Sequence, residues 1–472
     1  MMKNRFLFLV TLLAALSCAC AAAHAAVAVP FDSATLAQRS LQRRAVELAI
    51  WGVPIVSVEA MRQAYFRDAG AQYNDIVYWS KPSGWHNQTT TPNSSALYVY
   101  FNVNTRSGPV VIEIPPAQGA GVFGSLLDAW QVPLVDVGPE GEDKGLGGKY
   151  VLLPPDYSGA PPAGYLPVSA KTYNAYSLLR MVPASGSAED RARAQALIQQ
   201  LRVYPLAQAG APAAQRRIDM DGRLFDGIVH YDASFFGKLS SMLNEEPVQQ
   251  RDKLMMGMAR SLGMERGKSF QSGSGDSLQQ AAQEAHAWLM DGMPQQAGAH
   301  FWPERQWRLP VTPAAVRSAF TWEDSTLLDV DGRGVAFFWA YAAPMKIGKA
   351  SFYLTNFADA KGQALQGEHS YHLHVPAKVP ARQFWSLNVY DRETGAFIRQ
   401  AARVGLDSLE AGLERNADGS VDLFVGPTAP PGHAANWIPT LDGKPWFPLF
   451  RLYGPEKSLM DKSWQLPDFE RL

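Results

Sequence analysis

The segment from Glu368 to Phe397 decides the fold of the C-terminal part of the chain, and it reads EHSYHLHVPAKVPARQFWSLNVYDRETGAF. In SYHLHV and QFWSLNVY, polar residues fall between apolar ones with a period close to two. This period is typical of strands, because successive side chains of a strand point to opposite faces. The prolines between the two runs and Thr394-Gly395 after them are turn signals. The segment therefore predicts two strands of a β-rich domain.

The same pattern extends over residues 326–472. Four more runs are strand-like, namely GVAFFWAYA, KASFYLTNF, SVDLFVG and FPLFRLYG. Asp331-Gly332, Asp418-Gly419 and Asp442-Gly443 mark tight turns, since glycine accepts the positive φ that such turns require. Six or more short strands with this punctuation predict a C-terminal antiparallel β-sandwich that is jelly-roll-like.

Two further regions precede the sandwich, and together they make the chain α+β. Residues 32–168 begin with a helix that Asp32 or Ser33 can cap and that the breaker at residues 51–54 ends. A second helix over PIVSVEAMRQAYF and the strand-like runs ALYVYFNVN, GPVVIEIP, VPLVDVG and KYVLLPP follow. This order predicts an N-terminal α+β domain. Residues 169–325 contain several amphipathic stretches and are predicted to be a mainly helical segment.

The first 25 residues read as a signal peptide. They combine a basic start, an apolar run from Phe6 to Leu16 and the cleavage pattern Ala23-His24-Ala25. The run is shorter than the roughly 20 residues that a membrane-spanning helix needs, so no transmembrane segment is predicted. Lipidation at Cys18 or Cys20 is the weaker alternative, because neither has an aliphatic residue three positions before it. The prediction is a protein exported to the periplasm.

Composition narrows the classes of function. The chain has 43 Lys and Arg against 44 Asp and Glu, and this balance argues against nucleic acid or anionic lipid as a partner. Both cysteines lie in the predicted signal peptide. The mature chain would therefore have no disulfide, no thiolate metal site and no cysteine nucleophile.

Several segments resemble one bacterial family. Residues 91–115 and 147–165 resemble its N-terminal half, and residues 372–398, 416–440 and 446–470 resemble its C-terminal half. These halves are the paired domains of unknown function twelve-fifty-four and twelve-fourteen. The resemblance implies a secreted protein with an α+β domain, a helical segment and a jelly-roll-like sandwich, and it implies no reaction.

The chain departs from this family in one place. Similar proteins usually carry Arg or Asn and then Asp after Thr-Pro-Asn, whereas this chain continues from Asn93 with Ser94 and Ser95. A function that depends on that carboxylate in relatives would be altered or lost here.

Two histidines form one candidate site. His372 and His374 point to the same face of their strand and could chelate a divalent metal if a neighbouring strand adds a third ligand. His369, Asp391 or Asp422 could supply that ligand. The alternative is that both imidazoles are ordinary polar residues on an open strand face. A metal here would suit a metal-assisted hydrolase or oxidoreductase.

The leading hypothesis is a pocket between the N-terminal and C-terminal domains that binds a small molecule or an envelope-derived glycan. The residues predicted to line it are Asn93, Tyr98, His372, His374, Trp385 and Asn388. Amide and imidazole groups would orient the ligand, and Trp385 would supply apolar contact area. A structural envelope protein with exposed aromatic residues is a third hypothesis, and the oligomeric state is left open.

Overall fold

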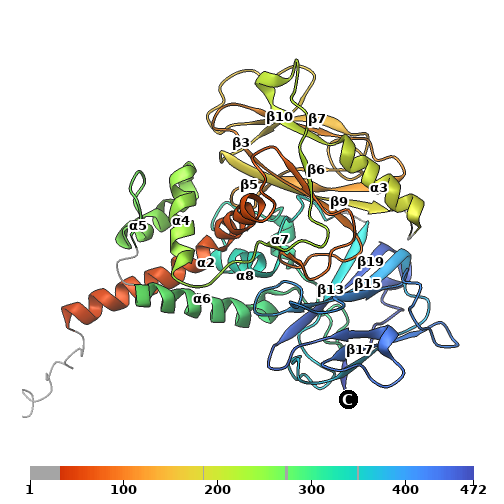
Figure 1. The fold of residues 1–472 in the computed structure, drawn as a ribbon. Coiled ribbons are helices and arrows are strands. Elements are labelled where there is room, and N and C mark those ends of the chain that lie inside the picture. The colour runs from red at the N-terminus through yellow and green to blue at the C-terminus, as the bar shows by residue number, and fades with distance from the viewer. Residues whose placement is uncertain (1–31, 184, 186, 272–274, 348–349) are drawn as a thin grey trace, which may run out of the picture. The chain divides into compact units, whose positions relative to one another are not determined.

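The computed structural model describes residues 32–183, 185, 187–271, 275–347 and 350–472 (Figure 1). The predicted signal peptide, with both cysteines, lies outside the described residues. A short unit ends at Arg43, and a large unit runs from Arg44 to Leu472. The large unit combines helices with several sheets, and the predicted α+β class is confirmed. In the part of the chain that the structure describes, none of the helices is both long and apolar enough to cross a bilayer.

Helix α2 (Ser33–Arg67) is one continuous helix of 35 residues. The prediction of two helices, with a break at residues 51–54, was wrong. Pro54 lies inside the helix and removes one backbone donor there. The helix continues because every residue from Leu48 to Arg62 is buried, so packing on all sides outweighs the low helix propensity of proline.

Two large sheets form most of the N-terminal part that the structure describes. The first has six strands in the order β11 (Arg217–Asp219), β1 (Ile76–Tyr78), β3 (Leu97–Asn104), β9 (Asn174–Pro183), β5 (Ala120–Asp128) and β6 (Pro133–Val137). The second has four, in the order β10 (Arg202–Pro205), β4 (Val110–Ile114), β7 (Gly148–Leu153) and β8 (Leu166–Ser169). Phe101 of β3, Ile112 of β4 and Leu197 of α3 (Ala188–Gln200) share one hydrophobic core. The two sheets and this helix therefore fold as one body.

The segment at 169–325 is less helical than predicted. It supplies β9 to the middle of the six-stranded sheet, and it also supplies β10, β11 and β12 (Phe225–Asp226), which pairs with β2 (Asn87–Gln88). The first six residues of β9 are all buried, so the strand lacks the alternation that identifies a half-exposed strand. The remaining helices of this segment are α4 (Ser234–Glu245), α5 (Lys253–Ser261), α6 (Gly275–Gln296) and α7 (Pro313–Arg317), with short 3₁₀ turns at Leu206–Gln208 and Gln250–Asp252.

Helix α8 (Val330–Trp339) replaces a predicted strand and turn. Asp329 caps the helix, because its Oδ1 accepts a hydrogen bond of 2.8 Å from the backbone N–H of Gly332. Most of α8 is buried, and a run that is apolar on all sides carries no period to separate strand from helix. Helix α8 packs beside α6.

The C-terminal part is formed by two four-stranded sheets. The first has the order β13 (Ser351–Thr355), β19 (Trp446–Pro455), β15 (Ala381–Asp391) and β16 (Gly405–Asp407). The second has the order β18 (Trp437–Pro439), β17 (Val421–Gly426), β14 (Tyr371–Val375) and β20 (Glu470–Arg471). All pairs are antiparallel except β17 with β18. A 3₁₀ turn (Ala434–Asn436) and helix α9 (Lys457–Met460) complete this part.

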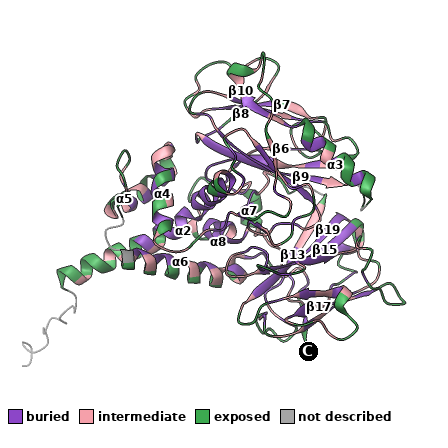
Figure 2. Ribbon diagram, viewed as in Figure 1, coloured by how far each residue is buried: buried purple, intermediate pink, exposed green. Residues whose placement is uncertain are grey.

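The segment Glu368–Phe397 gives one strand to each of these sheets, β14 to one and β15 to the other. The two sheets meet where the Tyr371 ring packs edge-on against Trp446, with 5.4 Å between ring centroids. Figure 2 shows the buried residues concentrated along the central strands of these sheets.

Candidate functional site

Three of the six predicted site residues meet where β3 faces β15 and β19. Asn93 donates from Nδ2 to the Tyr453 hydroxyl, and the Asn93 backbone N–H donates to the Tyr98 hydroxyl at 2.9 Å. Asn388 donates from Nδ2 to the Ser94 hydroxyl at 2.6 Å. All three predicted residues are buried. The structure therefore brings Asn93, Tyr98 and Asn388 together in the contact between the N-terminal and C-terminal parts.

Trp385 does not join this group. It lies three residues before Asn388 on β15, so its side chain points to the opposite face of the strand. There it stacks on Phe450 with a centroid distance of 5.4 Å and an interplanar angle of 15°. Only 4 % of Trp385 is exposed, so it packs inside the sandwich.

His372 and His374 also lie elsewhere, on β14 of the other sheet. Their Nε2 and Nδ1 atoms each lie 2.8 Å from the same Oδ1 atom of Asp422. Asn416 donates to the second oxygen of Asp422 at 2.7 Å. Within the described ranges, no group of three His, Cys, Asp or Glu side chains is arranged to hold a metal ion.

The hydrogen bonds of Asp422 to this histidine pair depend on the ionised form of its carboxyl group. Burial raises the pKa of Asp422, but hydrogen bonds from Asn416 and both imidazoles outweigh it and lower the pKa to about 2. A carboxyl group whose pKa is lowered on folding stabilises the folded state at pH values above the pKa that it has in the unfolded chain. This stabilisation is lost as the pH falls toward the lowered pKa of the folded state.

Asp422→Asn should therefore remove part of the acid sensitivity of the fold. Between about pH 4 and pH 2, we expect the free energy of unfolding of the wild type to fall by about 1 kcal/mol more than that of the variant, because solvent screens this partly exposed carboxyl. Urea unfolding at several pH values measures the difference. Asp442→Asn, at an exposed turn, is the control and should behave as the wild type. Equal slopes for wild type and Asp422→Asn would contradict the prediction.

Two arginines and four tyrosines lie together at the contact that contains Asn93 and Asn388. We call them the arginine–tyrosine cluster: Arg180, Arg451, Tyr98, Tyr353, Tyr390 and Tyr453. The Arg451 guanidinium lies 5.2 Å from the centre of the Tyr353 ring, and its Nη1 donates to Asn388 Oδ1 at 2.7 Å. The Arg180 guanidinium lies 5.7 Å from the Tyr98 ring. Sequence reasoning missed both arginines, although each interrupts an apolar strand run, in SLLRMV and in FPLFRLYG.

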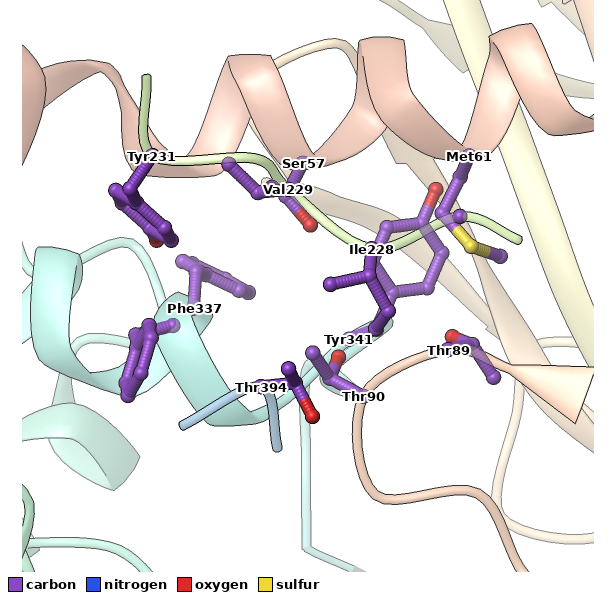
Figure 3. A pocket seen from close by; sticks show the side chains of 12 residues that line it. Ser57, Met61, Thr89, Thr90, Ile228, Val229, Tyr231, Phe337, Tyr341 and Thr394 are labelled. Carbon is purple, nitrogen blue, oxygen red and sulfur yellow. The ribbon is translucent and has the colours of Figure 1, made fainter. Parts of the chain in front are cut away.

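A small cavity lies next to this contact (Figure 3), with about 10 Å³ of room for the centre of a water-sized molecule. Its lining combines residues from α2, α8 and several loops: Ser57, Met61, Thr89, Thr90, Gly227, Ile228, Val229, Tyr231, Phe337, Phe338, Tyr341 and Thr394. None of the lining residues is charged. The hydroxyls of Thr89 and Thr90 are buried and have no hydrogen-bond partner among the described residues. The cavity is therefore apolar and aromatic, with two unused hydroxyl groups.

The loop at residues 89–95 runs from the cavity to the arginine–tyrosine cluster. Thr91 has a φ of 41°, a left-handed conformation that β-branched residues rarely adopt. It is held on both sides, because its N–H donates to Gly395 at 2.7 Å and its carbonyl accepts from Arg451 at 3.1 Å. Gly395 itself has a φ of 69°, and a Cβ there would lie 3.0 Å from the Trp339 backbone. Such strain persists only where the surroundings enforce it, and it concentrates at functional sites.

Comparison with known proteins identifies the domain on each side of this contact. The family described as a protein of unknown function, DUF1254, matches residues 73–205, and a second such family, DUF1214, matches residues 350–457. The chain carries both domains. The paired-domain resemblance is thereby confirmed. Thr89 and Thr90 belong to the DUF1254 domain and Thr394 to the DUF1214 domain, so both contribute to the cavity lining.

Two solved structures are similar over most of their length. The VPA0106 protein from Vibrio parahaemolyticus is 16 % identical, with a TM-score of 0.53 over 92 % of this chain and 100 % of that chain. A putative uncharacterized protein from Burkholderia cenocepacia is 14 % identical, with a TM-score of 0.41 over 92 % of this chain and 94 % of that chain. At such identities the first likeness shows the fold alone. No curated protein matches the chain significantly.

Proposed function

We propose that the protein is exported to the periplasm and binds a small, uncharged, largely apolar molecule in the cavity beside the contact of its DUF1254 and DUF1214 domains. The observation that carries the proposal is the pair of buried hydroxyls, on Thr89 and Thr90, that find no partner in the part of the chain that the structure describes. An unpaired buried hydroxyl costs about 1–3 kcal/mol, and natural proteins pair the great majority of such groups. A ligand with one or two hydrogen-bonding groups would satisfy both.

The residues that line the cavity favour an uncharged ligand with flat apolar surfaces. Phe337, Phe338, Tyr231 and Tyr341 offer flat apolar faces, which favour a planar or ring-shaped molecule. The lining offers no charge to pair with an ionised group, so a charged ligand would lose its hydration without compensation. The cavity leaves only about 10 Å³ for the centre of a water-sized molecule, the room of about one water, so a larger ligand enters only if the lining side chains move apart.

The test is an isosteric double substitution, Thr89→Val with Thr90→Val. Without ligand, the free energy of unfolding should stay equal or rise by about 1 kcal/mol, because two unpaired hydroxyls leave the interior. Native mass spectrometry of protein from its own periplasm should show an organic mass excess in the wild type and a lower occupancy in the variant, as expected for an affinity about tenfold weaker, or about 1.4 kcal/mol.

Thr355→Val is the matched control. The Thr355 hydroxyl is fully buried but donates to the Pro448 carbonyl at 3.0 Å. This variant should lose about 1–2 kcal/mol and keep the bound mass. A bare wild-type mass, or equal occupancy in the double variant, would contradict the proposed ligand.

A metal-assisted hydrolase or oxidoreductase at His372 and His374 is the second candidate. Both imidazoles converge on one carboxylate oxygen of Asp422. Among the described residues these side chains are not arranged to hold a metal ion, so metal binding would require them to move. A His-His-carboxylate set suits Zn²⁺ or Fe²⁺ chemistry. Elemental analysis of the wild type and of a variant with both histidines changed to alanine tests this candidate function. Equal metal content in the two proteins would contradict a metal site at His372 and His374.

A further inference from the structure

The mouth of the cavity lies where its lining is partly exposed to solvent. Of the described residues that line the cavity, four are partly exposed: Thr90, Val229, Tyr231 and Thr394. They come from three loops, namely the loop that contains Thr90, the segment before α4 and the turn after β15. We call these four residues the mouth of the cavity.

The mouth must open if the cavity is to take up the proposed ligand. The closed cavity leaves about 10 Å³ for the centre of a water-sized molecule, so a ring-shaped ligand enters only after part of the wall has moved. Ser57 and Met61 of α2 and Phe337 of α8 are buried within packed helices. Local opening favours segments with few buried contacts, so the loops of the mouth are the part expected to move.

One side chain of α6 contacts two sides of the mouth. His286 Nε2 lies 2.7 Å from the carbonyl oxygen of Glu393, the residue before Thr394. Since a carbonyl only accepts, Nε2 carries the proton and donates it. The His286 ring also stacks on the Tyr231 ring, with 4.8 Å between centroids and an interplanar angle of 24°. His286 therefore connects the turn that carries Thr394 to Tyr231, which lies on another side of the cavity (Figure 3).

The other contacts of this turn hold different parts of it. Arg392 donates from Nη2 to the Met290 carbonyl of α6 at 2.8 Å, and this bond fixes the start of the turn. The carboxylate of Glu393 pairs with Lys444, but both side chains are partly exposed, so solvent weakens the pair. The His286 bond thus holds the backbone next to Thr394, at the mouth itself.

We propose that His286 is the gate residue of the cavity: its bond to the Glu393 carbonyl keeps the mouth closed, and a ligand enters when that bond breaks and the turn at residues 391–395 moves away from Tyr231. This inference rests on the proposed function, because only a cavity that takes up a ligand needs a gate. His286 lies outside the lining, so it acts by positioning the turn and not by contact with the ligand. It sets how fast a ligand enters and leaves.

The test measures access to the cavity without any ligand. Ser57 lines the cavity and is 2 % exposed, and Ser57→Cys places a thiol of similar size there. Both native cysteines lie in the predicted signal peptide, so this thiol is the one to be modified in the exported chain. Methyl methanethiolsulfonate is small and uncharged, and it should modify the thiol only while the mouth is open. His286→Phe keeps a ring against Tyr231 but removes the donor, and it should raise the modification rate about fivefold, as for the loss of one hydrogen bond.

Two controls separate the gate from a general loss of stability. Ser240→Cys places a thiol on α4, at a residue that is 3 % exposed and outside the lining, where modification requires larger unfolding. In the wild-type background Ser57→Cys should react faster than Ser240→Cys, and His286→Phe should accelerate only the first. His300→Phe removes another bond between a histidine and a backbone carbonyl, that of Arg305, and should leave the rate at Ser57→Cys unchanged.

Amide hydrogen exchange gives a second measurement that needs no added thiol. In His286→Phe, residues 391–397 should exchange faster than in the wild type, while β14 should exchange as before. Equal rates at Ser57→Cys with and without His286→Phe would overturn the proposal. An equal acceleration at Ser57→Cys and Ser240→Cys would overturn it too, because His286 would then only stabilise the fold.

Failure of the gate and failure of the proposed function give different results. If Ser57→Cys responds to His286→Phe but protein from its own periplasm shows a bare mass, the gate is supported and the proposed ligand is wrong. If an organic mass is bound but the modification rate does not respond, the ligand enters by another route and the gate is wrong.

Discussion

Arg62→Met should lower the free energy of unfolding by about 3–5 kcal/mol, the usual loss when one partner of a buried ion pair is removed. Arg62 lies on α2 and is only 4 % exposed. It pairs with Glu59 at 2.6 Å on its own helix and with Glu245 at 2.6 Å on α4, and it donates to Asn174 Oδ1 on β9 at 3.1 Å. One guanidinium thus joins two helices to the six-stranded sheet.

The loss should be large because methionine can fill the space of Arg62 but cannot replace its charge. Glu59 is 3 % exposed and would be left as a buried carboxylate without its cation. Chemical denaturation followed by circular dichroism measures the loss. The matched control is Arg67→Met on the same helix, whose side chain is 57 % exposed and pairs with Asp68, and which should cost less than about 1 kcal/mol. Equal costs for the two variants would contradict this account of Arg62.

The sequence predicts well those strands that are exposed on one face. Tyr371, Leu373 and Val375 alternate with two histidines, and β14 forms where this alternation predicts it. Strand β9 and helix α8 were not predicted, since both are buried nearly all round and a continuous apolar run carries no period. The uninterrupted helix α2 was also not predictable locally, because packing that involves distant segments outweighs Pro54.

The same limit applies to the site. Asn93, Tyr98 and Asn388 were chosen for their chemistry, and the structure brings them together. Which face of β15 meets β3 depends on pairing between strands far apart in sequence, so Trp385 could not be placed from the sequence. Arg451 was missed because a charge within an apolar run was taken as part of a strand, although a buried arginine is itself a signal of a partner nearby.

The second large effect is expected at Asn388, which is fully buried and connects the two domains. Asn388→Leu should lower the free energy of unfolding by about 2–4 kcal/mol, because Arg451 Nη1 loses its acceptor and the Ser94 hydroxyl loses its donor. Urea unfolding measures this loss. Asn388→Asp has nearly the same shape, keeps an acceptor for Arg451 and adds a carboxylate beside it. It should therefore be much less destabilising than Asn388→Leu.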